Sequence, residues 1–232
     1  MSLQSELNDG LARLNQRLSK DGIADATKIA GSSRRVVCWI EWLKAQNHGC
    51  ECGALLAGSR SAIRETIFYS SLGLGRAAIG SLRCQIDLVL AFTYFCSHPI
   101  EWNRVVSTGE GFLLRSEVYD FHRTHIPKFG AKLTQLEQSS GVSLENIYHV
   151  LSAHIHAQSP LTLPKASPLS DLVLDSTRMA SIIDLQDKVD RALSNFLFAT
   201  HWVKWPEIPT AIVTEARGLL TTKQQAEFFV EK

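Results

Sequence analysis

Apolar residues recur every three or four positions along most of the chain, and this spacing constrains the fold more than any other feature. In the N-terminal segment five leucines are spaced by 4, 4, 3 and 4 residues, at Leu3, Leu7, Leu11, Leu14 and Leu18. Such spacing places one apolar stripe on an amphipathic helix. A longer pattern of the same kind runs from Leu172 to Trp202. The alternation typical of strands is nearly absent, so the sequence predicts an all-α fold, a helical bundle of roughly seven to ten helices.

Glycine and proline divide this pattern into segments. The first leucine stripe ends at Lys20–Gly22, where a cation is followed by a glycine, as at many helix ends. We therefore expect an N-terminal amphipathic helix over residues 1–22 and a single helical-bundle domain over residues 23–232. Glycines near position 73 predict a break in the helix-compatible segment 59–96. Three prolines within residues 159–171 predict a surface loop inside the domain.

The charge balance and the hydropathy restrict the possible partners. The 232 residues include 24 basic and 23 acidic side chains, so any nucleic-acid binding would need a local basic patch. The longest apolar run, Ile86–Cys96, contains Asp87 and is too short for the roughly 20 residues of a membrane-spanning helix. The polar N-terminus lacks the pattern of a secretory signal. We expect a soluble, cytoplasmic protein with no membrane partner.

The cysteines do not form a familiar metal-binding motif. The chain has five cysteines, and an odd number without an export signal argues against a disulfide framework. His48, Cys50 and Cys52 lie close together in HGCEC, but zinc sites usually combine two spaced pairs, and no second pair follows. The favoured interpretation is a cysteine-containing surface loop, and we expect no metal and no other cofactor. GLGRAAIG, residues 73–80, lacks the features of a phosphate-binding loop and indicates close helix packing instead.

Two pairs of charged and titratable residues are candidates for a site. Arg83 and Asp87 lie four positions apart in an apolar context, where they would form a structural salt bridge or orient a polar site. Arg115 and His122 lie seven positions apart and would share one helix face. An arginine there could hold a phosphate while the imidazole acts as acid or base on a ribose hydroxyl. The alternative is a solvated helix face.

A third candidate lies in the stretch YHVLSAHIHAQSP. Tyr148, Ser152 and His156 are spaced by four and would form one polar stripe on a helix that extends that far. His149 and His154 lie off this stripe. No GxSxG motif surrounds Ser152, so a serine hydrolase is not indicated. The alternative is a helix C-terminus, where histidines interact favourably with the helix dipole.

A family resemblance connects two of these segments. RCQIDLVLAFTYFCSHP followed by YHVLSAHIH resembles an arrangement in a group of bacterial helical proteins that are similar to distant HEPN-superfamily members. HEPN proteins are helical bundles often found in toxin–antitoxin and phage-defence systems. The likeness covers about residues 60 to 160. It implies that the site residues are Arg83, Asp87, Tyr148, Ser152 and His156.

Ribonucleases of the HEPN superfamily use an R-x4–6-H motif in a composite site of a dimer. In this chain Arg115 and His122 have the matching spacing, whereas no arginine lies four to seven positions before His154 or His156. A metal-independent ribonuclease is the activity that the resemblance implies, and the missing arginine makes a non-catalytic role its competitor.

Two functional hypotheses follow. In the first, the protein is HEPN-like and acts on RNA or nucleotides as a toxin or antiviral defence effector. Arg115 or Arg83 would then hold phosphate, and His122 or His156 would transfer protons. In the second, it is a non-catalytic interaction subunit or regulator in a multi-protein bacterial complex, as the leucine stripe and Trp202 with Trp205 suggest. Both hypotheses include a homodimer or a partner protein at the N-terminal helix.

Overall fold

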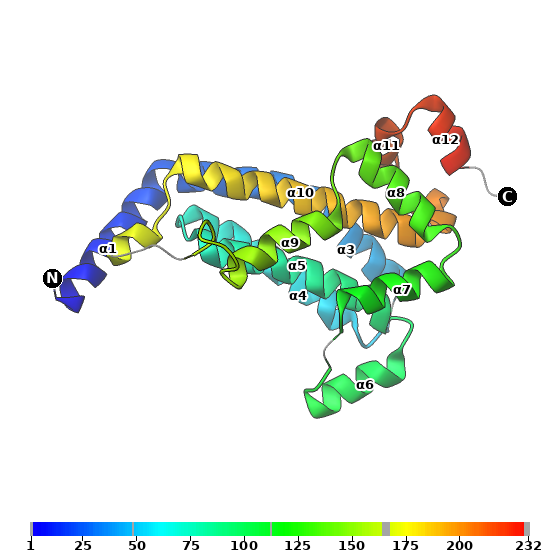
Figure 1. Cartoon of the computed structure of the whole chain (residues 1–232), viewed down its shortest axis with the longest axis horizontal. Coiled ribbons are helices and arrows are strands. Elements are labelled where there is room, and N and C mark those ends of the chain that lie inside the picture. The colour runs from blue at the N-terminus through cyan, green and yellow to red at the C-terminus, as the bar shows by residue number, and fades with distance from the viewer. Residues whose placement is uncertain (1, 48, 112, 164–167, 230–232) are drawn as a thin grey trace. The chain divides into compact units, whose positions relative to one another are not determined.

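The computed structural model describes residues 2–47, 49–111, 113–163 and 168–229, and these ranges contain helices and no strand (Figure 1). The all-α prediction is confirmed, although the helices outnumber the seven to ten expected. The α-helices are α1 (Leu3–Arg17), α2 (Ile23–Ser32), α3 (Arg34–Gln46), α4 (Gly53–Ser71), α5 (Gly75–Phe95), α6 (Pro99–Thr108), α7 (Arg115–His125), α8 (Phe129–Ser140), α9 (Leu144–Ile155), α10 (Ser176–His201), α11 (Thr210–Leu219) and α12 (Thr222–Phe228).

The chain forms two compact units. The first unit contains Met1–Arg34, Ser61–Gln85 and Glu145–Val189. The second unit contains Arg35–Arg60, Ile86–Leu144 and Asp190–Lys232. Each unit therefore combines segments that lie far apart in the sequence.

In the first unit the N-terminal helix does not stop where its sequence suggests. A π-helical turn, Leu18–Gly22, joins α1 directly to α2, so the helix end expected at Lys20–Gly22 is wrong. Gly22 has another use. A β-carbon at this position would lie 2.2 Å from the carbonyl oxygen of Ser71. The glycine is needed for close approach between two chain segments, which a local helix-stop pattern cannot reveal.

Arg17 fastens α1 within the first unit. Its guanidinium is buried, donates from Nε to the carbonyl oxygen of Leu174 at 3.1 Å, and forms a buried ion pair with Asp25. Near this contact α1 lies beside the 3₁₀ turn Leu169–Leu172, coloured yellow in Figure 1. A buried charge is tolerated when it is paired in this way, so this polar contact holds α1 in the unit, whereas Leu3, Leu7 and Leu11 on its apolar side are exposed.

The middle of the first unit joins α4, α5 and α10 through a buried polar network. The side-chain amides of Gln85 and Gln186 exchange two hydrogen bonds of 3.1 Å, and Gln85 Nε2 also donates to Thr66 Oγ1 at 2.9 Å. All three side chains are buried. The network satisfies polar groups that would otherwise be costly inside the unit.

The glycines between α4 and α5 behave as expected. The helix breaks at Gly73, whose φ of 76° lies in the left-handed region. Leu74 then forms an isolated antiparallel bridge with Val173. A β-carbon on Gly75 would lie 2.3 Å from Leu174 Cδ1. Close packing thus explains these small residues, and no phosphate-binding loop is required.

The second unit is built around aromatic side chains. Trp39 of α3 donates from Nε1 to Ser194 Oγ at 3.0 Å, and its ring makes edge contacts with Trp42 and Phe198. Trp202 is also buried and donates to the carbonyl oxygen of Pro127 at 2.7 Å. The fully buried large side chains of this unit include Trp39, Phe92, Phe129, Phe196, Phe198 and Phe228. Buried indole N–H groups find acceptors, as the packing of tryptophan requires.

One helix in the described part of the chain, α5, is long and apolar enough to cross a membrane by length and composition alone. Of its most apolar window, 61% is buried inside the protein. Core helices of globular proteins can have the same length and composition, so these two features alone do not make α5 a membrane-spanning helix.

Candidate functional site

Three of the residues singled out from the sequence meet in the first unit. The guanidinium carbon of Arg83 on α5 lies 3.4 Å from the centre of the Tyr148 ring on α9. Arg83 Nε donates to Ser152 Oγ at 3.3 Å, one helical turn further along α9. All three side chains are half-buried. We call this group the Arg83 cluster; it stacks a planar cation on an aromatic face and adds a hydroxyl.

The predicted stripe loses its last member because the helix ends too early. α9 stops at Ile155, and Ala157 has a φ of 50°, in the left-handed region. The backbone N–H of His156 still bonds to the carbonyl oxygen of Ser152, at 2.9 Å, but the residue is exposed. Within the described residues, the His156 side chain makes no hydrogen bond or ion pair.

A groove of about 880 Å³ lies in the same unit. Its apolar lining comes from Ile79 on α5, from Ile182 and Leu185 on α10, and from leucines of the segment between α9 and α10. Arg76 and Arg178 are exposed polar members of its wall. A volume between about 300 and 1,000 Å³ is typical of small-molecule sites, and the mixture of apolar floor and charged wall is typical as well.

His154 also lines this groove, although its spacing suggested only a helix-end residue. It lies on the last turn of α9, beside the point where Arg76 donates to the carbonyl oxygen of Ile155 at 3.0 Å. Helix spacing could not identify His154, because the groove is formed by residues of α5, α10 and the 159–171 region. Residues 164–167 of that region lie outside the described residues.

The charges of the groove lining are balanced, with two arginines and two carboxylates. Asp184 is paired with Lys188 at 2.7 Å, and Asp171 remains as a second carboxylate in the lining. Against them stand Arg76 and Arg178. For the part of the chain that is described, the Arg178 guanidinium has neither a hydrogen bond nor an ion pair. An anionic group in the groove would therefore find at least one unpaired cation.

The other predicted site residues belong to the second unit. Asp87 is exposed on α5, and Arg115 is half-buried at the start of α7. His122 is 0% exposed and packs against the rings of Phe129 and Phe196. A substrate hydroxyl could not reach this imidazole without a movement of the surrounding side chains.

Burial decides the chemistry of His122. Its Nδ1 lies 2.7 Å from the carbonyl oxygen of Val118, whereas Nε2 has no hydrogen-bond partner among the described residues. Burial lowers the pKa of His122 to about 4, because the charged imidazolium would lose its hydration. The ring is neutral at pH 7, and its environment is that of a core side chain.

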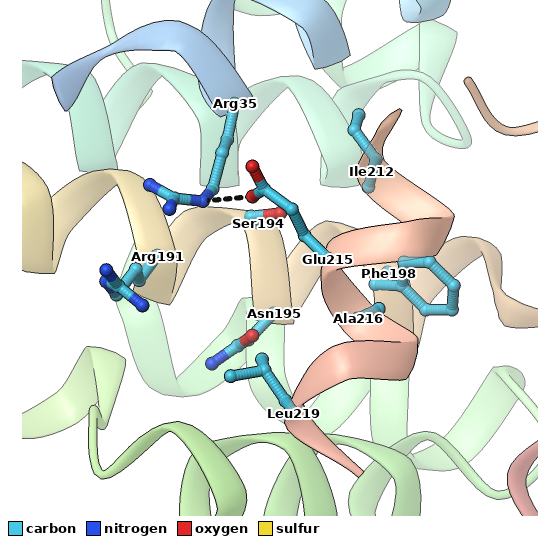
Figure 2. Close-up of a pocket in the computed structure, with 9 residues that line it drawn as sticks. All are labelled: Arg35, Arg191, Ser194, Asn195, Phe198, Ile212, Glu215, Ala216 and Leu219. Carbon is cyan, nitrogen blue, oxygen red and sulfur yellow. Dashed lines mark hydrogen bonds and ion pairs between the residues drawn. The ribbon is translucent and has the colours of Figure 1, made fainter. Parts of the chain in front are cut away.

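A smaller pocket, of about 240 Å³, lies among α3, α10 and α11 in the second unit (Figure 2). Figure 2 shows Arg35 pointing to Glu215. Arg35 Nε donates to Glu215 Oε2 at 2.5 Å. Arg35 also pairs with the buried carboxylate of Asp190 at 2.9 Å. The two ion pairs engage Arg35, Asp190 and Glu215, and the volume is below the usual range of ligand sites, so we assign this pocket a structural role.

Three cysteines gather in the second unit, and the sequence pattern revealed only two of them. The sulfur atoms of Cys50 and Cys52 are 3.1 Å apart, and the Cys50 sulfur is 3.7 Å from that of Cys96. All three lie within 4.8 Å of one another. We call them the trithiol cluster. Cys96 immediately follows an apolar helix, where a thiol is normally a small core residue, so no sequence signal identified it.

The three thiols alter one another's acidity. The hydrogen bond with Cys52 lowers the pKa of Cys96 to about 6, because a thiol donor stabilises a neighbouring thiolate. The same pairing raises the pKa of Cys52. His48, the remaining member of the HGCEC motif, lies outside the described residues.

Comparison of the chain with protein-family models, with curated proteins and with solved structures finds no match.

Proposed function

We propose that the protein binds RNA or a nucleotide on the face of the first unit that carries the Arg83 cluster and the adjoining groove residues of α5, α9 and α10. In this proposal it is a HEPN-like toxin or phage-defence effector. The observation that carries the proposal is the stacking of Arg83 on Tyr148, 3.4 Å from its ring centre, in the unit that also holds a groove of about 880 Å³.

Each part of this face suits one part of a nucleotide. Arginine is well suited to phosphate because its planar fork donates two parallel hydrogen bonds. Arg76 and Arg178 supply guanidinium groups at the groove wall, and the apolar lining offers a surface for a base. The chain has a net charge of only +1, so binding must depend on this local arrangement.

Among the histidines, His156 is the best candidate for proton transfer. It is exposed and follows α9 within one turn of Ser152, whereas His122 is buried. An exposed imidazole can approach a ribose hydroxyl, which cleavage of RNA through that hydroxyl requires. We propose cleavage that needs no metal ion.

Binding can be tested with a fluorescently labelled single-stranded RNA and with labelled ATP at two salt concentrations. The double variant Arg76→Ala/Arg178→Ala should weaken binding by about tenfold per arginine, since a hydrogen bond to a charged group contributes about 1.5–3 kcal/mol. Arg64→Ala is the matched control, because Arg64 is exposed on α4 in the same unit and does not line the groove. Equal affinities for the wild type and the double variant would refute the proposed site.

Cleavage requires a separate assay. Purified protein incubated with total RNA in excess EDTA should degrade it, and His156→Ala should slow the reaction by about 100-fold or more, as removal of a general acid or base does. If the protein binds RNA measurably but leaves it intact, it is an RNA-binding protein and the nuclease activity is excluded.

The exposed leucine stripe of α1 favours a second candidate function, that of an interaction subunit. Leu3, Leu7 and Leu11 are 68%, 45% and 58% exposed. Exposed leucines at spacings of three and four are typical of a helix that pairs with another helix. The tryptophans contribute less than their sequence suggested, because Trp202 is buried and bonded to Pro127.

This second function is tested by light scattering after size-exclusion chromatography. The wild type should elute as a dimer or with a bound partner, and Leu7→Ser/Leu11→Ser should elute as a monomer with unchanged helix content. A wild type that is monomeric and free of partners would exclude the interaction subunit.

A further inference from the structure

We propose that the trithiol cluster, Cys50, Cys52 and Cys96, is a binding site for one soft, thiolate-preferring metal ion, with Zn²⁺ as the first candidate. The site lies in the second unit and does not depend on the proposed function, which concerns residues of the first unit.

Two of the ligands are brought together by a tight turn between α3 and α4. The backbone N–H of Cys50 donates to the carbonyl oxygen of Asn47 at 3.1 Å, and that of Gly53 donates to the carbonyl oxygen of Cys50 at 3.0 Å. Gly49 has a φ of 82°, a conformation that glycine adopts without strain. The two successive turns fold the CxC segment back on itself and place the Cys50 and Cys52 sulfurs 3.1 Å apart.

The third ligand comes from the end of another helix. Cys96 directly follows the last residue of α5, and its sulfur lies 3.7 Å from that of Cys50. The Asn47 side chain steadies this corner, because its amide nitrogen donates to the carbonyl oxygen of Leu43 at 2.9 Å while its oxygen lies 3.4 Å from the Cys96 sulfur. The three thiols are thus held by two separate chain segments.

The 3.7 Å between the Cys50 and Cys96 sulfurs is close to the separation in a metal–thiolate centre, and the 3.1 Å between Cys50 and Cys52 would widen on binding. Tetrahedral zinc with Zn–S bonds of about 2.3 Å places its sulfur ligands about 3.8 Å apart. The three sulfurs here all lie within 4.8 Å of one another, so small side-chain rotations suffice to surround an ion. On binding, each thiol would release its proton to solvent and coordinate as thiolate.

The chemistry of the ligands selects the kind of ion. Thiolates prefer zinc and monovalent copper, whereas magnesium and calcium require oxygen ligands. Cys52 is buried, but Cys50 and Cys96 are only half-buried, so the cluster reaches the surface. An ion can therefore enter, and the fourth coordination position can be filled from solvent.

Neither simple packing nor a disulfide accounts for the cluster as well. Cys38 and Cys84 do not belong to the group of clustered thiols. A disulfide would use two of the three sulfurs and leave the third without a role. A metal ion uses all three and joins the α3–α4 turn to the end of α5.

Cobalt spectroscopy provides the first test. The full chain, reduced and freed of metal, should bind one Co²⁺ and develop a thiolate-to-cobalt charge-transfer absorption that one equivalent of Zn²⁺ abolishes. Cys50→Ser, Cys52→Ser and Cys96→Ser should each lose this absorption. Cys38→Ser and Cys84→Ser, the matched controls, should retain it. A wild type without the absorption, or cluster variants that retain it, would overturn the proposal.

A second measurement uses only the wild type, so it does not depend on the folding of variants. Native protein is alkylated with and without Zn²⁺, and the modified cysteines are located by mass spectrometry. Zinc should protect Cys50, Cys52 and Cys96 while leaving the labelling of Cys38 and Cys84 unchanged. Equal labelling with and without zinc refutes the site. A Cys50–Cys52 disulfide in protein that binds no zinc after reduction also refutes it, in favour of a redox pair.

Discussion

The guanidinium carbon of Arg83 lies 3.4 Å from the centre of the Tyr148 ring, a separation that allows close stacking of the cation on the aromatic face. The contact joins α5 to α9 within the first unit and positions Nε of Arg83 against Ser152 Oγ. Because each residue can be exchanged separately, the energy of the contact can be measured.

A double-mutant cycle with Arg83→Gln and Tyr148→Leu should give a coupling free energy of about 0.5–2 kcal/mol, since a cation over an aromatic ring contributes about that much. The measurement is urea unfolding of the wild type, both single variants and the double variant. Contacts that either residue makes elsewhere cancel in the cycle. Strictly additive losses would show that the stacking does not stabilise the folded state.

Stability should fall between pH 6.5 and about pH 4 because of His122. The unfolded chain takes up a proton on this imidazole near its ordinary pKa of 6.5, whereas burial keeps the folded form neutral down to about 4. Protons therefore favour the unfolded state in this window, by up to about 3 kcal/mol at its acid end, since one pKa unit corresponds to about 1.4 kcal/mol.

The variant His122→Phe should show a shallower loss of stability than the wild type as pH falls from 7 to 4. Some loss will remain, because desolvation also lowers the pKa of His201 to about 4. The control is His125→Phe, an exchange of an exposed imidazole on the same helix. Parallel stability curves for wild type and His122→Phe, measured by urea unfolding at each pH, would contradict this account.

Gly22→Ala should destabilise the protein by about 1–3 kcal/mol, the usual cost of overpacking. The added β-carbon would lie 2.2 Å from the carbonyl oxygen of Ser71, and backbone cannot yield as a flexible side chain does. Gly31→Ala is the matched control, because no atom lies within 4 Å of a β-carbon there. Alanine in that helix should stabilise by about 0.5–1 kcal/mol. Thermal melts of the two variants should shift in opposite directions.

The buried glutamine pair predicts a non-additive result. Gln85→Leu should cost about 1–3 kcal/mol, because it leaves the buried amide of Gln186 without its partner. The double variant Gln85→Leu/Gln186→Met should be less destabilised than Gln85→Leu alone, since the orphaned amide is also removed. Unfolding in urea measures both. A double variant as unstable as the sum of the single changes would disprove the pairing argument.

The sequence by itself determined the helices. A helix is formed by hydrogen bonds between residues four apart, and its apolar face repeats with a similarly short period. Both features therefore depend on residues that are close together in the sequence. The break at Gly73 followed from glycine alone, because left-handed backbone is most favourable for that residue. Helix spacing also predicted that Tyr148 and Ser152 share one face of a helix. Arg83, which contacts both, lies on another helix.

Only the tertiary structure decided which residues meet and which are buried. Cys96 reaches Cys50 across 46 positions of sequence, and no local period connects them. The sequence around Gly22 is typical of a helix end, but the structure shows that this glycine allows the backbone of Ser71 to approach closely. His122 had the spacing of a catalytic residue but lies in an aromatic core that residues far along the chain complete. Burial and proximity depend on chain segments that a local pattern does not contain, and for that reason the site required the fold.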